Sequence, residues 1–480
     1  MTGAPVSTEL TPMRIDGRAV TAAEETVVHS PYDGHEVGRV PTGTAADIDR
    51  AVAVALERHR GGALPAHQRA EILDRAVTVL DAHQEELAQS ISAEAAKPIS
   101  TARIEAARSL DTFRFAAVAA RTLTGEMIPM EASGPGTGKL GFTLRVPVGV
   151  LAAISPFNFP LNLVAHKVAP AIAAGCPTVL KPASTTPLTA LLLARLLEDE
   201  AGLPPGWLNV VTVPGRVADH LVTHPDVGAI SFTGSPEVGW GIRARAPRIR
   251  VGLELGNNAP VIVHRDADLD RAVAKITVGG YSYSGQTCIA VQRVYVHDAV
   301  ADEFLDRFTA AVGALVTGDP ADPATNVSAL ISTSETDRVA ECVEAATAAG
   351  ATAVAGGDRA EHGVLRPTVL DGVTDDMTVC RTEVFGPVVG VQRYTDVETA
   401  FASANDSRYG LQAGIFTADL SLGLEAAHRL DYGGVCVNEV PTFRADQMPY
   451  GGIKDSGNTK EGPAWAVREM TEERMVVIQR

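Results

Sequence analysis

The chain has 480 residues, of which 45% are hydrophobic and 21% are charged, so we expect a soluble globular protein of two or more domains. Its formal net charge of −17 argues against a nucleic-acid partner, because phosphate binding requires clustered lysine and arginine. The chain has no apolar run of membrane-spanning length and no basic-then-apolar leader, so we expect neither a membrane partner nor a signal peptide.

The cysteines are few and scattered. None belongs to a CxxC pair or a Cys/His cluster, so no metal site is expected. Reduced thiols in a cytoplasmic protein are the simplest interpretation. The five residues are Cys176, Cys288, Cys342, Cys380 and Cys436.

The first third of the chain reads as short strands followed by helices. Residues 1–45 are expected to be irregular, with turns at 14–18 and 31–34. Thr44 and Asp47 resemble a capping box with Asp in place of Glu. Apolar residues then recur at helical spacing, which predicts helices over residues 45–58, 65–82, 84–96 and 99–121.

Residues 125–146 have a different pattern. Two apolar segments flank a turn rich in glycine and serine, which predicts a β-hairpin. The last segment, 474–478, is apolar enough to be a further strand. Apolar strand edges often find cover in a partner subunit, so we expect the hairpin to contact a second copy of the chain.

Strands and helices then alternate in two series. The first predicts strands over 149–154, 177–181, 208–211 and 229–232, with helices over 161–173, 187–201, 217–223 and 237–245. The second predicts strands over 259–263, 293–296, 384–393, 414–417 and 434–438, with helices over 269–280, 299–316, 336–349, 397–405 and 420–430. Such β-α repeats predict an α/β fold with parallel sheets and ligand sites at the carboxyl ends of the strands.

Seven short motifs in a fixed order resemble the aldehyde dehydrogenase superfamily, and the resemblance extends from about residue 15 to the C-terminus. It implies two Rossmann-like α/β domains and a β-hairpin oligomerisation element in a homodimer or homotetramer. The implied limits are 1–125 and 147–255 for the cofactor domain, 256–455 for the catalytic domain, and 126–146 with 465–480 for oligomerisation. The motifs are 155–160 (SPFNFP), 181–184 (KPAS), 232–235 (FTGS), 253–256 (LELG), 285–288 (GQTC), 383–387 (EVFGP) and 449–452 (PYGG).

The resemblance assigns the catalytic residues. Cys288 corresponds to the nucleophile, whose thiolate attacks an aldehyde to give a thiohemiacetal and then a thioester. Glu254 matches the general base that activates water. Asn158 matches the side-chain donor to the oxyanion, together with the Cys288 backbone N–H. The alternative for Cys288 is an inert buried cysteine, which we expect for the other four.

The cofactor prediction is NAD or NADP. No GxGxxG motif occurs in the sheet region; instead Gly234-Ser235 opens a helix suited to pyrophosphate. By resemblance, Lys181 binds the adenosine ribose, Glu383 the nicotinamide ribose, and Phe385 lies beside the nicotinamide. The predicted cofactor-binding residues are Ile154, Ser155, Pro156, Phe157, Lys181, Ser184, Gly215, Phe232, Gly234, Ser235, Val238, Leu255, Glu383 and Phe385.

Two residues near these motifs depart from common members of the superfamily. NAD-preferring relatives often carry Glu at the position of Ser184, where it repels a 2′-phosphate. Serine removes that repulsion, so NADP should be accepted; alternatively, Ser184 caps the next helix. Asn257 replaces a usual glycine, and Asn tolerates left-handed backbone, so we expect the turn after Glu254 to survive.

The substrate prediction rests on Arg444, Asn162, His166 and Thr287. Arg444 could hold an anionic group, or it could pair with Asp446 or another acid. Asn162 and His166 share a helix face and either line the substrate tunnel or are structural. Thr287 supplies no charge beside the nucleophile, where relatives that act on phosphorylated or phosphonate aldehydes often carry Arg.

These residues predict an NAD(P)-dependent enzyme that oxidises a small polar aldehyde, neutral or anionic, to its carboxylate. The resemblance is strongest to the branch with lactaldehyde, phosphonoacetaldehyde and sulfolactaldehyde dehydrogenases. Two alternatives stay open. A CoA-acylating enzyme would pass the thioester to CoA, although such enzymes typically lack the counterpart of Glu254. A non-catalytic binding protein would be expected to lose Cys288, Asn158 or Glu254.

Overall fold

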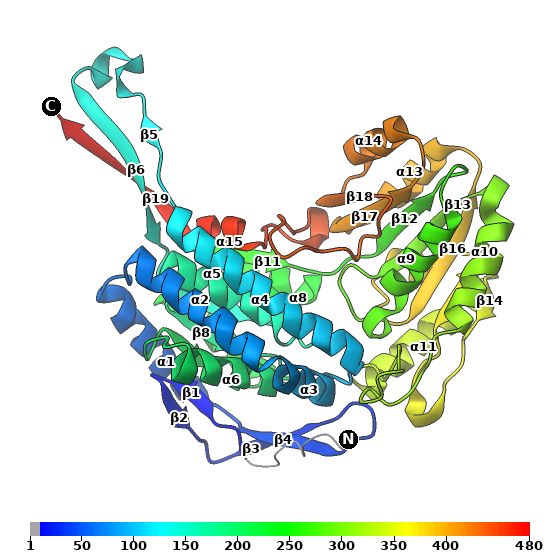
Figure 1. The fold of residues 1–480 in the computed structure, drawn as a ribbon, viewed down its shortest axis with the longest axis horizontal. Helices are drawn as coiled ribbons and strands as arrows, with labels where there is room; N and C mark the ends of the chain where they lie inside the picture. Colours follow the sequence, from blue (N-terminus) through cyan, green and yellow to red (C-terminus); the bar gives the residue numbers. More distant parts are fainter. Residues whose placement is uncertain (1–9) are drawn as a thin grey trace.

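The computed structural model describes residues 10–480. Two seven-stranded sheets, each packed against helices, lie side by side, and a three-stranded arm projects from the first (Figure 1). We call each seven-stranded sheet with its helices a unit, the first containing β1 and the second β12. A two-stranded sheet, β3 (Glu25–His29) with β4 (Glu36–Pro41), borders the first unit. The turn predicted at 31–34 joins these two strands. The part of the predicted irregular start that covers residues 1–9 lies outside the described residues.

The first sheet has the strand order β11-β10-β7-β8-β9-β1-β2. Strands from β11 to β9 are parallel, β1 joins β9 antiparallel, and β2 forms the far edge. The parallel strands therefore bring their carboxyl ends to one edge, where ligands bind in such sheets. The strands are β1 (Met13–Ile15), β2 (Arg18–Val20), β7 (Val150–Ile154), β8 (Thr178–Lys181), β9 (Leu208–Val210), β10 (Val227–Thr233) and β11 (Arg250–Glu254).

Helices cover both faces of this sheet. Leu151 and Ala153 of β7 lie in one hydrophobic core, and Val150 and Ala152 lie in the other, because successive side chains of a strand point to opposite faces. Burial on both faces explains the uninterrupted apolar runs in the sequence. One core includes α2 (Ala66–Ala82), α3 (Gln84–Ala95), α4 (Ile99–Thr122), α5 (Asn162–Ala174) and α6 (Leu188–Arg195), and the other includes α1 (Ala45–Arg60), α7 (Gly215–Val222) and α8 (Pro236–Arg245).

The second sheet has the order β14-β15-β16-β13-β12-β17-β18. All neighbours are parallel except β14, which joins β15 antiparallel at one edge. The strands are β12 (Ala259–Val263), β13 (Val291–His297), β14 (Thr352–Ala355), β15 (Thr368–Asp371), β16 (Val388–Tyr394), β17 (Gln412–Phe416) and β18 (Gly434–Val437). The helices are α9 (Leu269–Tyr281), α10 (Asp298–Gly313), α11 (Thr333–Ala348), α12 (Thr378–Arg381), α13 (Val397–Asn405) and α14 (Leu420–Arg429).

The arm consists of β5 (Met127–Ile128), β6 (Lys139–Pro147) and β19 (Thr471–Gln479). The predicted hairpin is confirmed by the pairing of Met127 with Phe142, and the C-terminal strand runs antiparallel along the whole of β6. Figure 1 shows the arm standing away from the body, with the C-terminus at its end. Several large apolar side chains on it are exposed: Met127, Leu144, Met475, Val477 and Ile478.

The structure contains strands and α-helices that the sequence patterns did not predict: β11, β14, β15, α12 and α15 (Pro463–Glu469). Strand β11 begins with Arg250 and contains Gly252, so its apolar signal is weak. The helix predicted over 187–201 is α6 followed by a π-helical turn, Leu196–Glu200. The start predicted for α1 is confirmed, since the Thr44 backbone N–H donates to the Asp47 carboxylate at 2.8 Å.

Candidate active site

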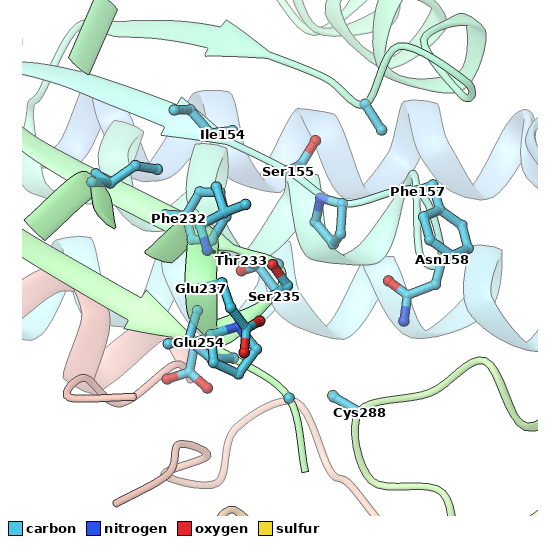
Figure 2. A pocket seen from close by; sticks show the side chains of 18 of the residues that line it. Ile154, Ser155, Phe157, Asn158, Phe232, Thr233, Ser235, Glu237, Glu254 and Cys288 are labelled. Atoms are coloured by element: carbon cyan, nitrogen blue, oxygen red, sulfur yellow. Dashed lines mark hydrogen bonds between the residues drawn. The ribbon is translucent and has the colours of Figure 1, made fainter. Parts of the chain in front are cut away.

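A cavity of about 690 Å³ lies at the carboxyl ends of β7, β8, β10 and β11 and is closed on its other side by residues of the second unit. Figure 2 shows Asn158, Glu254 and Cys288 around it, each on a separate segment of the chain. Every residue predicted for catalysis or for cofactor binding lines this cavity, and none of the four predicted for the substrate does. The sequence motifs therefore converge in space as one site.

Cys288 follows a strained turn after α9. Tyr283, Ser284 and Gly285 have φ values of 49°, 54° and 72°, in the left-handed region. A Cβ at Gly285 would lie 2.1 Å from the Gly386 carbonyl oxygen, so the turn requires glycine there. Burial raises the pKa of the Cys288 thiol to about 12, so the free thiol needs local stabilisation of its thiolate to react.

Asn158 lies between β7 and α5, and its side chain reaches the loop that carries the nucleophile. Its Nδ2 donates to the Gln286 carbonyl at 2.9 Å, two residues before Cys288. The buried Lys97 ammonium donates to the Asn158 carbonyl at 2.6 Å and stacks over the Phe159 ring at 3.7 Å. Two hydrogen bonds, one from its side chain and one to its backbone, therefore hold Asn158, the oxyanion donor predicted from the sequence, beside the loop that carries Cys288.

Glu254 ends β11 and is buried, and neither of its carboxylate oxygens has a hydrogen-bond partner among residues 10–480. Burial, with the nearby Glu461 carboxylate, raises its pKa well above the usual range. Gly451 makes room for this group, since a Cβ there would lie 2.6 Å from Glu254 Oε1. A carboxylate with a raised pKa and free oxygens can accept a proton from water near neutral pH.

The other end of the cavity fits a dinucleotide. The Ser155 hydroxyl is buried without a partner in the described chain, which leaves it available to a ligand. Lys181 ends β8, and burial lowers its pKa to about 8. Ser235 caps α8 by accepting from the Val238 N–H at 3.4 Å, and this helix N-terminus faces the cavity.

Two of the predicted cofactor residues face the first unit from the second. Glu383 accepts the Asn257 backbone N–H at 2.9 Å, and Phe385 has a φ of 51° and meets the Phe157 ring edge-on at 5.9 Å. Asn257 does not have a positive φ. The left-handed backbone that we invoked for the turn after Glu254 does not occur at this residue, so that reason was wrong. The Asn257 amide instead donates to the Gln412 carbonyl at 3.2 Å.

Ser184 lies on the cavity wall beside Lys181 and Gly215. The alternative that it caps α6 does not hold. Helix α6 is capped by Glu94, whose carboxylate accepts the N–H groups of Leu188 at 2.7 Å and Thr189 at 3.0 Å. The Ser184 side chain is thus not required for the helix and is exposed.

The four predicted substrate residues lie outside the cavity, and three of them, Arg444, Asn162 and His166, are engaged with other side chains. Arg444 pairs with Glu461 at 2.9 Å, and each side chain is 7% exposed. The alternative of an acidic partner for Arg444 therefore holds, although the acid is Glu461 and not Asp446. Burial alone would raise the pKa of Glu461, but the Arg444 and Lys167 charges lower it to about 2.

Asn162 and His166 form a buried network around Asp446. The Asn162 amide donates to Asp446 Oδ1 at 3.1 Å, and His166 Nε2 lies 2.9 Å from the same oxygen. Arg108 of α4 donates to both oxygens of Asp446, at 2.8 and 3.1 Å. Thr287 is buried, and its hydroxyl has no partner in the described part of the chain.

The family profile that matches is described as "Aldehyde dehydrogenase family" and covers residues 19–476. The chain belongs to the aldehyde dehydrogenase family. The expected family, the expected α/β fold and the expected NAD(P)-dependent oxidation of a small polar aldehyde are thereby confirmed.

Known proteins similar to this aldehyde dehydrogenase match it over nearly its whole length. A 3-sulfolactaldehyde dehydrogenase of Priestia aryabhattai is 43% identical, with 97% of each chain covered. A lactaldehyde dehydrogenase of Methanococcus aeolicus is 38% identical, over 94% of this chain and 96% of that one. The crystal structure of aldehyde dehydrogenase 21 from Physcomitrella patens, in complex with the reaction product succinate, superposes with a TM-score of 0.95 at 38% identity and 99% coverage of both chains.

The sequence analysis of this aldehyde dehydrogenase did not predict several residues that line the cavity or contact the nucleophile. Arg338, Arg408 and Tyr409 face the cavity from the second unit, and they lie outside the motifs that guided the prediction. Tyr450 contacts the nucleophile, with its hydroxyl oxygen 2.8 Å from Cys288 Sγ. Tyr450 belongs to a motif that was noted, but nothing local in the sequence indicates this contact.

Within residues 10–480, no helix has the length and apolar character needed to cross a bilayer.

Proposed function

We propose that this aldehyde dehydrogenase oxidises a small aldehyde carrying an anionic group to its carboxylate, with NAD or NADP as the cofactor. The observation that carries the catalytic part is the meeting of Cys288, Asn158 and Glu254 at one cavity, although they lie on three segments far apart in the chain. A nucleophile, an oxyanion donor and a base are the groups that this oxidation requires.

In this proposal the Cys288 thiolate attacks the aldehyde carbon, so that a C–S bond forms and the carbonyl π electrons move to oxygen. The Asn158 amide and the Cys288 backbone N–H then donate to the oxyanion, and each donor of this kind contributes about 3–4 kcal/mol. The chemistry that bound NAD or NADP supplies is hydride acceptance, and a thioester is left on Cys288.

Hydrolysis of the thioester falls to Glu254 in this proposal. Its carboxylate accepts a proton from water while the water oxygen bonds to the thioester carbon. The C–S bond then breaks, and Cys288 leaves as a thiolate. The raised pKa of Glu254 supports this role, because a stronger base removes the proton more readily.

The cofactor assignment draws on the residues that remain free at the other end of the cavity. In this proposal Lys181 and Ser155 hold the ribose and phosphate groups and Glu383 holds the second ribose, and the proposal is supported by the presence of all three in the cavity wall. Ser184 neither caps α6 nor carries a charge, so nothing at that position repels a 2′-phosphate. We therefore propose that both NAD and NADP are used.

Two arginines, and the molecules named for two relatives, support the proposal of an anionic substrate. The Nε of Arg444 is a buried donor without a partner in the described residues, and Arg108 is 27% exposed although it pairs with Asp446. The names 3-sulfolactaldehyde and succinate denote molecules with a sulfonate or a carboxylate, groups that arginine binds well. Lactaldehyde, the substrate named for another relative, is neutral and defines the alternative.

The test compares succinate semialdehyde with butanal, a neutral aldehyde of equal chain length, by NADH and NADPH formation. We expect kcat/KM to favour the anionic aldehyde, and this preference to fall in Arg444→Lys and Arg108→Gln but not in Arg114→Gln, an exposed control on α4. The ratio of the two kcat/KM values cancels general damage to the enzyme. An unchanged ratio would remove the anion proposal, and no reduced cofactor with any aldehyde would remove the oxidation itself.

Three further parts of the proposal concern the whole molecule. We propose that the exposed apolar side chains of the arm are covered by a second subunit in a dimer or tetramer. Light scattering of Leu144→Glu, which should dissociate the assembly, tests this.

The cofactor and catalytic domains are proposed to meet between Glu254 and Ala259, where the chain passes between the sheets. The five free cysteines support a cytoplasmic location.

A further inference from the structure

The hydroxyl of Tyr450 lies against the nucleophile. Its oxygen is 2.8 Å from Cys288 Sγ, and the side chain is buried. In the described chain this sulfur is the only hydrogen-bond partner of the hydroxyl. A buried phenol with one partner directs its proton to that partner.

The position of Tyr450 is fixed by its backbone. Tyr450 and Glu461 exchange two backbone hydrogen bonds, of 3.1 and 2.6 Å, which close the loop between them. The Arg444 guanidinium lies over the Tyr450 ring, 4.0 Å from its centre, and is itself held by Glu461. The phenol is therefore clamped at its backbone and on one face before any substrate arrives.

The surroundings of Cys288 explain why such a donor matters. Burial disfavours its thiolate, and so do the nearby Glu383 and Glu254 carboxylates; Tyr450 and Arg444 act in the opposite direction. Burial also raises the pKa of Tyr450 well above its ordinary value, so the phenol keeps its proton when Cys288 ionises. The hydroxyl is then the donor and the sulfur the acceptor.

We propose that Tyr450 is a catalytic residue that donates a hydrogen bond to the Cys288 thiolate, both when the thiolate attacks the aldehyde and when it leaves the thioester. The phenol keeps its proton throughout, so no bond to Tyr450 forms or breaks. Arg444 acts in this proposal as a positioning residue, because it holds the ring and places a positive charge beside it. The inference rests on the proposed role of Cys288 as the nucleophile.

The test measures Cys288 directly, without aldehyde or cofactor. The alkylation rate of Cys288 by iodoacetamide is followed against pH by mass spectrometry of the Cys288 peptide, which separates it from the other four cysteines. In Tyr450→Phe we expect the midpoint of this profile to move to higher pH. Because hydrogen bonds to charged groups are the stronger ones, kcat/KM should fall about 10- to 100-fold, by the same factor for succinate semialdehyde and butanal.

Tyr281→Phe is the matched control, because Tyr281 is equally buried but donates to the Thr368 carbonyl, away from the cavity. Its alkylation profile should match the wild type. An unchanged midpoint in Tyr450→Phe would overturn the proposal, and so would a loss of kcat/KM confined to the anionic aldehyde, which would indicate substrate binding.

A second variant covers the case in which Tyr450→Phe does not fold. Replacing Tyr450 with 3-fluorotyrosine keeps the hydroxyl and makes it a stronger donor, so the alkylation midpoint should move to lower pH. No movement, or movement to higher pH, would contradict the proposal. If the midpoints move as expected but no aldehyde is oxidised, the proposed function fails while the contact of Tyr450 with Cys288 stands.

Discussion

Lys97 makes a buried ion pair whose loss should affect both stability and catalysis. Its side chain is fully buried, and its ammonium donates to the Glu105 carboxylate and to the Asn158 carbonyl. Glu105 in turn accepts the N–H groups of Leu161 and Asn162, both at 3.0 Å, at the start of α5. Lys97→Met removes the charge and keeps most of the volume of the side chain.

The expected cost follows from what Lys97→Met leaves behind. The Glu105 carboxylate stays buried without its counter-charge, and removing one partner of such a pair typically costs about 3–5 kcal/mol. The Asn158 carbonyl also loses a charged donor, which increases the loss. We expect kcat to fall as well, because the segment that carries Asn158 loses its anchor next to Cys288.

Urea unfolding followed by tryptophan fluorescence, at one fixed protein concentration, measures the stability change. Lys275→Met is the control, because its pair with Glu439 is partly exposed and should contribute no more than about 1 kcal/mol. In Lys97→Met/Glu105→Gln the neutral amide oxygen can still cap α5, so part of the lost stability should return. The ion pair does not stabilise the fold through its charge if Lys97→Met lowers the free energy of unfolding no more than the control does, or if adding Glu105→Gln restores none of that free energy.

Other features lead to further predictions. Burial raises the pKa of Glu94 from 4.5 to about 7, so its contribution to stability is present below pH 4.5 and falls by about 3 kcal/mol as the pH rises to about 7. Glu94→Gln should lose this dependence, and urea midpoints at pH 5 and pH 8 check it. Gly285→Ala should cost more than about 1 kcal/mol from its positive φ alone, and the clash with Gly386 should reduce kcat; normal turnover in this variant would show that the turn can relax. Ser184→Glu should lower kcat/KM for NADP at least about 10-fold while largely retaining that for NAD, and an equal loss for both would refute the role of Ser184 in cofactor choice.

The sequence predicted the parts of the site that lie within short motifs. Cys288, Glu254 and Asn158 are each flanked by residues that form their own turn or strand end, so local pattern and chemistry indicate them together. The cofactor-binding residues could be predicted from the sequence for the same reason. The sheets followed from apolar runs, except where a strand such as β11 carries Arg and Gly and has little apolar signal.

Contacts between segments distant in sequence could not be predicted in this way. Whether Arg444 meets a substrate or an acid depends on where Glu461 folds, 17 residues later. The contact between Tyr450 and Cys288 joins residues 162 positions apart, and Lys97 reaches Asn158 across 61 positions. Charges and hydroxyls reveal their type in a sequence, but their partners are set only by tertiary packing.

The arm joins two distant parts of the chain. Its long strands pair in register from Thr471 with Pro147 to Gln479 with Lys139, across more than 300 intervening residues. A contact between residues so far apart closes a long loop, and the entropy of loop closure has to be offset before the pairing contributes any stability. The edge of β6 that receives β19 therefore stays unpaired until late in folding, and an unpaired strand edge is a template for aggregation.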